Sequence, residues 1–114
     1  MTDRVYADSL GIALSEPRAG AVTCTAASTT LVTPASDRRL RLRWLSLSST
    51  STGTECVVTV SFGGTQVLYL WGLPAPGAFS RRSIREADNV GDALVIQLSP
   101  TGGPVYVNYE VEEV

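Results

Sequence analysis

The sequence contains no histidine among its 114 residues. Histidine is the usual general base of enzymes, the commonest ligand of transition metals, and the side chain that most often changes charge near neutral pH. Its absence argues against most familiar catalytic mechanisms and against a histidine-based metal site or pH switch. No nucleophile motif or phosphate-binding loop occurs either. We therefore expect a protein without enzymatic activity, cofactor or bound metal.

The sequence also contains no lysine, so all nine basic residues are arginines. A GC-rich genome and selection for arginine chemistry both explain this bias. Arginine suits protein interfaces, because its planar guanidinium group pairs with carboxylates through two hydrogen bonds and stacks on aromatic rings. The net charge is −2, so no overall basic field draws the chain to nucleic acid or to anionic membranes.

Long apolar runs and cysteines are scarce as well. No apolar run approaches the roughly 18 residues needed to span a bilayer, and residues 1–6 lack the layout of a signal peptide. We therefore expect synthesis in the host cytoplasm and no membrane contact. Cys24 and Cys56 are the only cysteines. Two thiols make no zinc site by themselves, and in a chain made in the cytosol buried free thiols are a better interpretation than a disulfide.

Serine, threonine, glycine and valine are plentiful, which is typical of strands and turns. Segments in which apolar and polar side chains alternate are expected to be strands with one buried face. These segments are 21–26, 29–33, 38–48, 55–62, 65–71, 93–99 and 105–111, whereas 79–90 is expected to be irregular. About seven or eight short antiparallel strands predict one all-β domain, a β-sandwich or jelly roll.

The most specific local signal is the pair Gly63 and Gly64, which separates two of these strands. A tight type I′ turn needs positive φ at both central residues, which glycine adopts without steric cost. The pair therefore predicts a hairpin between segments 55–62 and 65–71.

Residues 1–19 differ from the rest of the chain, because they mix charged and apolar residues without turn signals. We expect them to form an extended N-terminal arm that precedes a β-sandwich domain of residues 20–114. A short helix over 5–14, or an outer strand folded back on its own sandwich, is the alternative. The apolar arm residues expected to contact a neighbouring subunit are Tyr6, Leu10, Ile12 and Leu14.

Four arginines lie at the start of the expected strand 38–48, and three of them project from one face about 6.6 Å apart. This row is a candidate contact for the carboxylates of a protein partner. Nucleic-acid phosphates are a weaker alternative, because the chain is acidic overall. A solvated face neutralised by acids on adjacent strands is the other interpretation. The residues of this row are Arg38, Arg39, Arg41 and Arg43.

The alternation in the same strand slips at Trp44, because Leu45 and Leu47 fall on the arginine side. A β-bulge is expected there, since one extra residue restores the inward direction of the leucines.

Three further clusters have plain structural interpretations. Segment 86–92 is expected to be a polar turn, because it lacks the spacing of a calcium loop. Glu110, Glu112 and Glu113 on the terminal strand are expected to deter edge-to-edge pairing. Tyr69 and Trp71 share a face that is either core or subunit contact, or else a platform for sugars.

The run Arg38 to Ser48, followed by Val57 to Gly64, resembles small structural proteins of tailed bacteriophages. These carry an Arg/Leu run, a Ser-rich stretch and a valine strand that ends in Phe-Gly-Gly. Segments 91–99 and 105–111 are similar to the end of such phage domains. The likeness is one of pattern and length, so it carries over no functional residues.

The resemblance implies a jelly-roll or sandwich building block of the virion. It implies first a capsid decoration (cement) protein that binds the major capsid protein and forms a homotrimer, and otherwise a tail, baseplate or fibre protein. A carbohydrate-binding module is the alternative from a different class, with possible glycan binding through the aromatic face.

Overall fold

The computed structural model describes residues 6–7, 13–14 and 18–114. Within these residues every regular element is a β-strand. None of the described segments is a helix that could cross a membrane. The strands are β1 (Tyr6–Ala7), β2 (Ala13–Leu14), β3 (Arg18–Cys24), β4 (Ser28–Val32), β5 (Leu40–Ser49), β6 (Cys56–Phe62), β7 (Gln66–Leu73), β8 (Gly77–Arg81), β9 (Arg85–Glu86), β10 (Leu94–Ser99) and β11 (Val105–Glu113).

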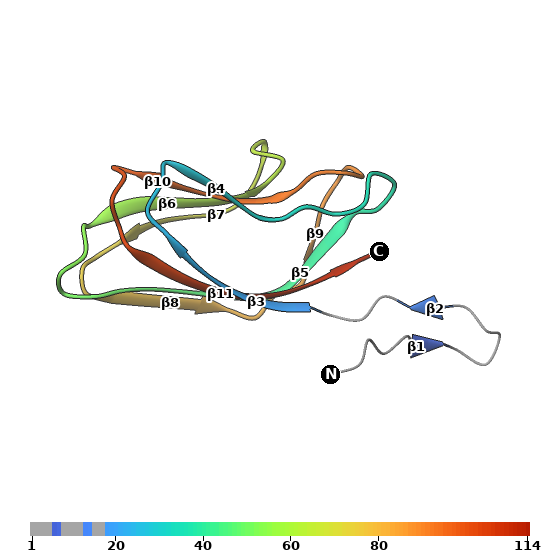
Figure 1. Cartoon of the computed structure of the whole chain (residues 1–114), viewed down its shortest axis with the longest axis horizontal. Coiled ribbons are helices and arrows are strands. Elements are labelled where there is room, and N and C mark those ends of the chain that lie inside the picture. The colour runs from blue at the N-terminus through green and yellow to red at the C-terminus, as the bar shows by residue number, and fades with distance from the viewer. Residues whose placement is uncertain (1–5, 8–12, 15–17) are drawn as a thin grey trace.

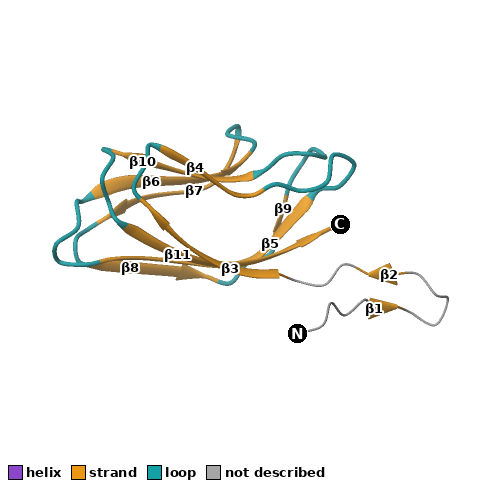
Figure 2. Cartoon of the chain, in the orientation of Figure 1, coloured by secondary structure: helices purple, strands orange, loops and turns teal. Residues whose placement is uncertain are grey.

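Strands β3 to β11 form two antiparallel sheets that pack face to face as a sandwich (Figures 1 and 2). One sheet has the order β4-β10-β6-β7. The other has the order β3-β11-β5-β8, and β9 pairs with β5 beyond the end of β8. If β8 and β9 are counted as one interrupted edge strand, this is the strand order of an eight-stranded jelly roll. The predicted all-β sandwich or jelly roll is confirmed.

The core lies between the sheets and consists of alternate residues from nearly every strand. Alternation places one side-chain set inward because successive residues of a strand point to opposite faces. The predicted inward faces of β6, β10 and β11 are confirmed. The fully buried large side chains are Phe62, Leu40, Leu42, Leu45, Leu47, Leu94, Ile96, Val58, Val60, Val105, Val107 and Val111.

Cys24 and Cys56 are free thiols buried at the margin of this core, as predicted. Burial raises the pKa of the Cys24 thiol, and a hydrogen bond with Thr29 offsets part of that rise. Burial also raises the pKa of Cys56. Both thiols are therefore held in the protonated form.

The predicted hairpin is confirmed, since β6 and β7 are antiparallel neighbours joined at Gly63 and Gly64. Both glycines have positive φ, at 65° and 78°, and the N–H of Thr65 donates to the carbonyl of Phe62. A Cβ at Gly63 would also lie 2.7 Å from the carboxyl carbon of Asp92. The position therefore needs glycine for its backbone conformation and for the approach of the 86–92 turn.

The prediction that 79–90 is irregular is wrong over two stretches, since β8 and β9 lie there. In β8 only Phe79 points toward the core side, opposite Leu47, while its neighbours are small and face outward. A five-residue strand with one inward aromatic side chain gives too short an alternation to recognise. Segment 87–92 does form the expected turn.

The bulge predicted near Trp44 is confirmed, because the pairing of β5 with β11 shifts register between Glu110 and Val111. Trp44 lies opposite Glu110, and Leu42 lies opposite Val111, so Arg43 is the extra residue. The bulge returns Leu45 and Leu47 to the core. It also leaves Trp44 half-buried instead of on the face of Leu40 and Leu42.

One side chain crosses between the sheets. Tyr109 of β11 lies opposite Gly20 of β3, and a Cβ at Gly20 would overlap its ring. The Tyr109 hydroxyl donates to the carbonyl of Leu31 in β4, at 3.2 Å. The missing side chain of Gly20 thus makes room for an aromatic ring that links the two layers.

Strands β1 and β2 pair antiparallel, with Tyr6 opposite Leu14. Leu10 and Ile12 lie outside the described residues. Strand β3 begins at Arg18, inside the segment expected to be the arm. The division into an arm and a domain, and the contacts of the four arm residues, stay predictions.

Candidate assembly surface

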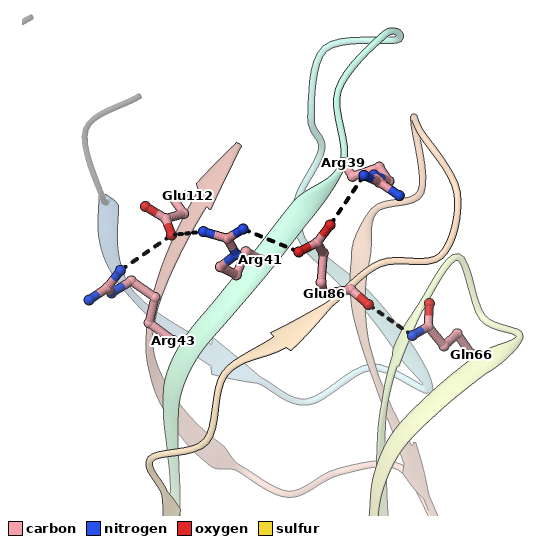
Figure 3. A network of polar contacts seen from close by, with 6 residues as sticks. All are labelled: Arg39, Arg41, Arg43, Gln66, Glu86 and Glu112. Atoms are coloured by element: carbon pink, nitrogen blue, oxygen red, sulfur yellow. Dashed lines mark hydrogen bonds and ion pairs between the residues drawn. The ribbon is translucent and has the colours of Figure 1, made fainter. Parts of the chain in front are cut away.

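The outer face of the β3-β11-β5-β8 sheet carries a row in which arginines and glutamates alternate (Figure 3). We call it the Arg–Glu row. The order of the row is Arg39, Glu86, Arg41, Glu112, Arg43 and Glu110. Three strands supply it: β5 carries Arg41 and Arg43 with Arg39 just before it, β9 carries Glu86, and β11 carries the other two glutamates. The cross-strand register places these opposite charges side by side.

Arg41 is the centre of the row. Its two terminal nitrogens donate to Glu112 at 3.0 Å and to Glu86 at 3.2 Å. The hydrogen bond to Glu112, and then that to Glu86, raises the pKa of the Arg41 guanidinium further above its ordinary value. Glu112 in turn accepts from Arg43 at 3.3 Å. Each charge of the row therefore has a partner within the chain.

The glutamates of β11 do not protect a sheet edge. Strand β11 is the last along the chain but lies in the interior of its sheet, between β3 and β5. The prediction that Glu110, Glu112 and Glu113 deter edge pairing is wrong for this reason. Glu113 instead pairs with Arg18 at 3.6 Å and accepts the backbone N–H of Ala35.

A second cluster closes one side of the sandwich, where β7 and β8 are the edge strands of the two sheets. The rings of Tyr69 and Trp71 stack with centroids 5.0 Å apart, and Phe79 lies against Trp71 at 3.6 Å. The Tyr69 hydroxyl is 2.6 Å from the hydroxyl of Ser83. Tyr69 and Trp71 are half-buried against the core. Their rings cover one another and do not lie side by side as an open sugar platform.

Three arginines lie over aromatic rings at this side of the molecule. The guanidinium carbon of Arg81 is 5.1 Å from the ring centroid of Phe79, and that of Arg85 is 5.6 Å from Tyr69. Arg82 lies 5.8 Å from the ring of Trp44. These distances are in the range of cation–π attraction. Within residues 18–114, none of the three makes an ion pair, in contrast to the arginines of the Arg–Glu row.

The outer face of the other sheet is more apolar. Val57, Val67 and Leu70 are 46%, 52% and 64% exposed. Val67 points outward although it was grouped with Tyr69 and Trp71, because a register shift between Val60 and Ser61 interrupts the alternation of β7.

An open groove of about 550 Å³ adjoins this face at the ends of β6, β7 and β10. Its lining holds one carboxylate, that of Glu55, and is otherwise uncharged when the Cys56 thiol is protonated. It therefore presents no pair of a nucleophile and a base.

Comparison with solved structures identifies the same fold in viral and cellular assemblies. The Helicobacter pylori bacteriophage KHP30 capsid contains a chain that matches with a TM-score of 0.58 and 13% identity, over 89% of this chain and 88% of that one. A chain of the cyanophage Pam1 capsid asymmetric unit matches with a TM-score of 0.55 and 14% identity, over 97% and 94%. The fold is a capsid-type jelly roll.

The core of the Drosophila NLP protein has the same fold, with a TM-score of 0.58 and 22% identity, over 83% of this chain and 95% of that one. Its structure was described in relation to pentamer formation and histone binding. No protein-family model matches the sequence, and no curated protein matches it.

The structure brings three of the predicted contact arginines together and neutralises them. Arg39, Arg41 and Arg43 are joined through glutamates, which is the arrangement expected of a neutralised sheet face. Arg38 is exposed, and its carbonyl accepts the N–H of Gly91. A contact of this row with a partner protein stays a prediction.

Sequence reasoning missed the arginines at positions 81, 82 and 85. They fall in a segment expected to be irregular, and their spacing follows no strand period. The signal that identifies them is spatial, because their aromatic partners lie on three different strands, β5, β7 and β8.

Proposed function

We propose that this protein is a non-enzymatic structural protein of a phage virion, and that it acts as a capsid decoration (cement) protein. In this role a homo-oligomer, a trimer by the sequence resemblance, binds the assembled head and bridges neighbouring subunits of the major capsid protein. The observation that carries the proposal is the nearly complete mutual coverage with a chain of the cyanophage Pam1 capsid asymmetric unit.

Two further features support a role in assembly. The sandwich exposes large apolar side chains on one sheet, while the other sheet carries the Arg–Glu row. The chain therefore presents two chemically different outer faces to its surroundings. Many copies that bind only the assembled lattice stabilise it by mass action. The Arg38–Arg43 row and the N-terminal residues 6–14 are the proposed contacts with the head.

Binding to purified empty heads tests the proposal. The protein is expected to co-sediment with heads assembled from the major capsid protein of the same phage, and to saturate at a fixed number of copies per capsid subunit. Purified tails from the same phage serve as the control particle. Binding to tails and not to heads would overturn the decoration role in favour of a tail or baseplate role, and binding to neither would overturn both.

A glycan-binding module is not favoured. Trp71 is covered on its two sides by Tyr69 and Phe79, so its ring faces are occupied by protein. A glycan array probed with the purified protein is therefore expected to give no signal that depends on Trp71.

A further inference from the structure

The arginines at positions 81, 82 and 85 differ from those of the Arg–Glu row in having no carboxylate partner within residues 18–114. They lie within five consecutive residues, so the Cα atoms of Arg81 and Arg85 are at most about 14 Å apart. Arg81 and Arg82 are exposed. Three cations so close together repel one another, and an anionic partner removes that cost.

The aromatic rings hold these cations in place without using their hydrogen bonds. Each guanidinium lies over a ring, at 5.1, 5.8 and 5.6 Å, and an arginine placed in this way keeps its N–H donors free for a carboxylate. Ile84, between the arginines, is 62% exposed. Arginine, aromatic rings and an exposed aliphatic side chain together are the composition of an interface hot spot. We call residues 81–85 the basic patch.

The turn 88–92 carries the complementary charge. Asp88 is exposed, Asp92 is half-buried, and Val90 between them is 55% exposed. Within residues 18–114 neither aspartate forms an ion pair. The turn thus matches the basic patch in kind, with carboxylates around one exposed aliphatic side chain.

This turn is anchored on two sides. The side chain of Gln66 in β7 accepts the N–H of Asp88 at 2.7 Å and donates to the carbonyl of Glu86 at 3.0 Å (Figure 3). The N–H of Gly91 donates to the carbonyl of Arg38. A rigid turn loses little conformational entropy on binding, which favours its use as a contact.

We propose that the basic patch of one copy of this chain binds the acidic turn, residues 88–92, of a second copy. The inference names the contact between copies in the homo-oligomer of the proposed function and rests on that proposal. A second copy is the occupant because the chain itself holds both members of the contact. Nucleic acid fits less well, since an exposed isoleucine lies among the cations and the chain is acidic overall.

A charge swap in the full-length chain tests the contact. Arg82→Glu with Arg85→Glu is expected to weaken self-association at least about tenfold, because like charges then face each other. Adding Asp88→Arg and Asp92→Arg to the same chain is expected to recover most of the loss, since the contact is restored with its signs exchanged. The control is Arg18→Gln, which removes an arginine charge outside the patch and is expected to leave association unchanged.

The readouts are oligomer dissociation by sedimentation equilibrium, thermal unfolding for integrity of the fold, and head binding. An unassociated wild-type chain that still binds heads would overturn this inference and leave the proposed function standing. The same holds for an oligomer that withstands the charge reversal in a folded variant. Loss of head binding with intact oligomers would show that the patch binds the head and not a second copy. Wild-type protein that associates by this contact but binds no head would refute the decoration role alone.

Discussion

At the scale of single residues, the fold depends on positions where a side chain is missing. Gly20 has an extended backbone conformation that any residue adopts, so its backbone does not require glycine. The ring of Tyr109 occupies the space in which a Cβ at position 20 would lie. Tyr109 can therefore cross the sandwich and bond to Leu31 only because residue 20 has no side chain.

Gly20→Ala is expected to lower the free energy of unfolding by about 1–3 kcal/mol, the usual effect of overpacking a buried site. Denaturant titration measures it. Gly72→Ala is the matched control, because it also lies in a strand and a Cβ there meets nothing within 4 Å. Equal stability of the two variants would show that Tyr109 moves aside at no cost and that the crossing contributes little.

At the scale of elements, the Arg–Glu row attaches a weak strand to a strong one. Strand β9 has two residues and pairs only with β5. Glu86 adds ion pairs to Arg39 and Arg41, and the N–H of the following Ala87 donates to the carbonyl of Leu40. The row therefore holds the β8–β9 edge, and with it the basic patch, against the body of the sheet.

Glu86→Gln is expected to loosen β9 with little change in global stability, since these ion pairs are partly exposed and weak individually. Hydrogen exchange of the Ala87 amide should become faster, while amides in β10 and β6 keep their protection. Glu55→Gln is the control, because Glu55 is exposed and makes no ion pair within residues 18–114. Unchanged exchange at Ala87 would mean that backbone pairing alone holds β9.

These elements also show how far sequence reasoning reached. The β6–β7 hairpin and the buried faces of β10 and β11 followed from local patterns, because a Gly-Gly turn and strict alternation need no distant partner. The partners of Arg41 did not, since Glu86 and Glu112 lie 45 and 71 residues away. Which strand borders which is decided by packing of the whole sandwich. The central place of β11 could not be inferred from its sequence for the same reason.

At the scale of the whole molecule, the stability of the sandwich is linked to pH through its two thiols. The pKa values of Cys24 and Cys56 are raised in the folded state by burial, whereas an unfolded thiol ionises at about pH 8.5. Below that pH both states hold the protons and no dependence arises. Above it the unfolded state releases protons first, so stability falls as pH rises toward the folded-state pKa.

The wild-type protein is thus expected to lose more stability between pH 7.5 and pH 10 than a Cys24→Ala/Cys56→Ala variant, in denaturant titrations under reducing conditions. The variant controls for tyrosines, which also titrate in this range. Parallel losses in the two proteins would contradict the linkage. Iodoacetamide should label both thiols at neutral pH only after unfolding.

The position of β11 also constrains when the chain can fold. Strands β3 and β5 do not touch as neighbours in their sheet, because β11 pairs with both of them. During translation the first half of this sheet must wait, with its apolar edges uncovered, until residues 105–113 have left the ribosome. Pairings this distant in sequence close slowly. The nascent chain therefore passes through a period of exposure to aggregation and proteolysis that ends only when its last strand arrives.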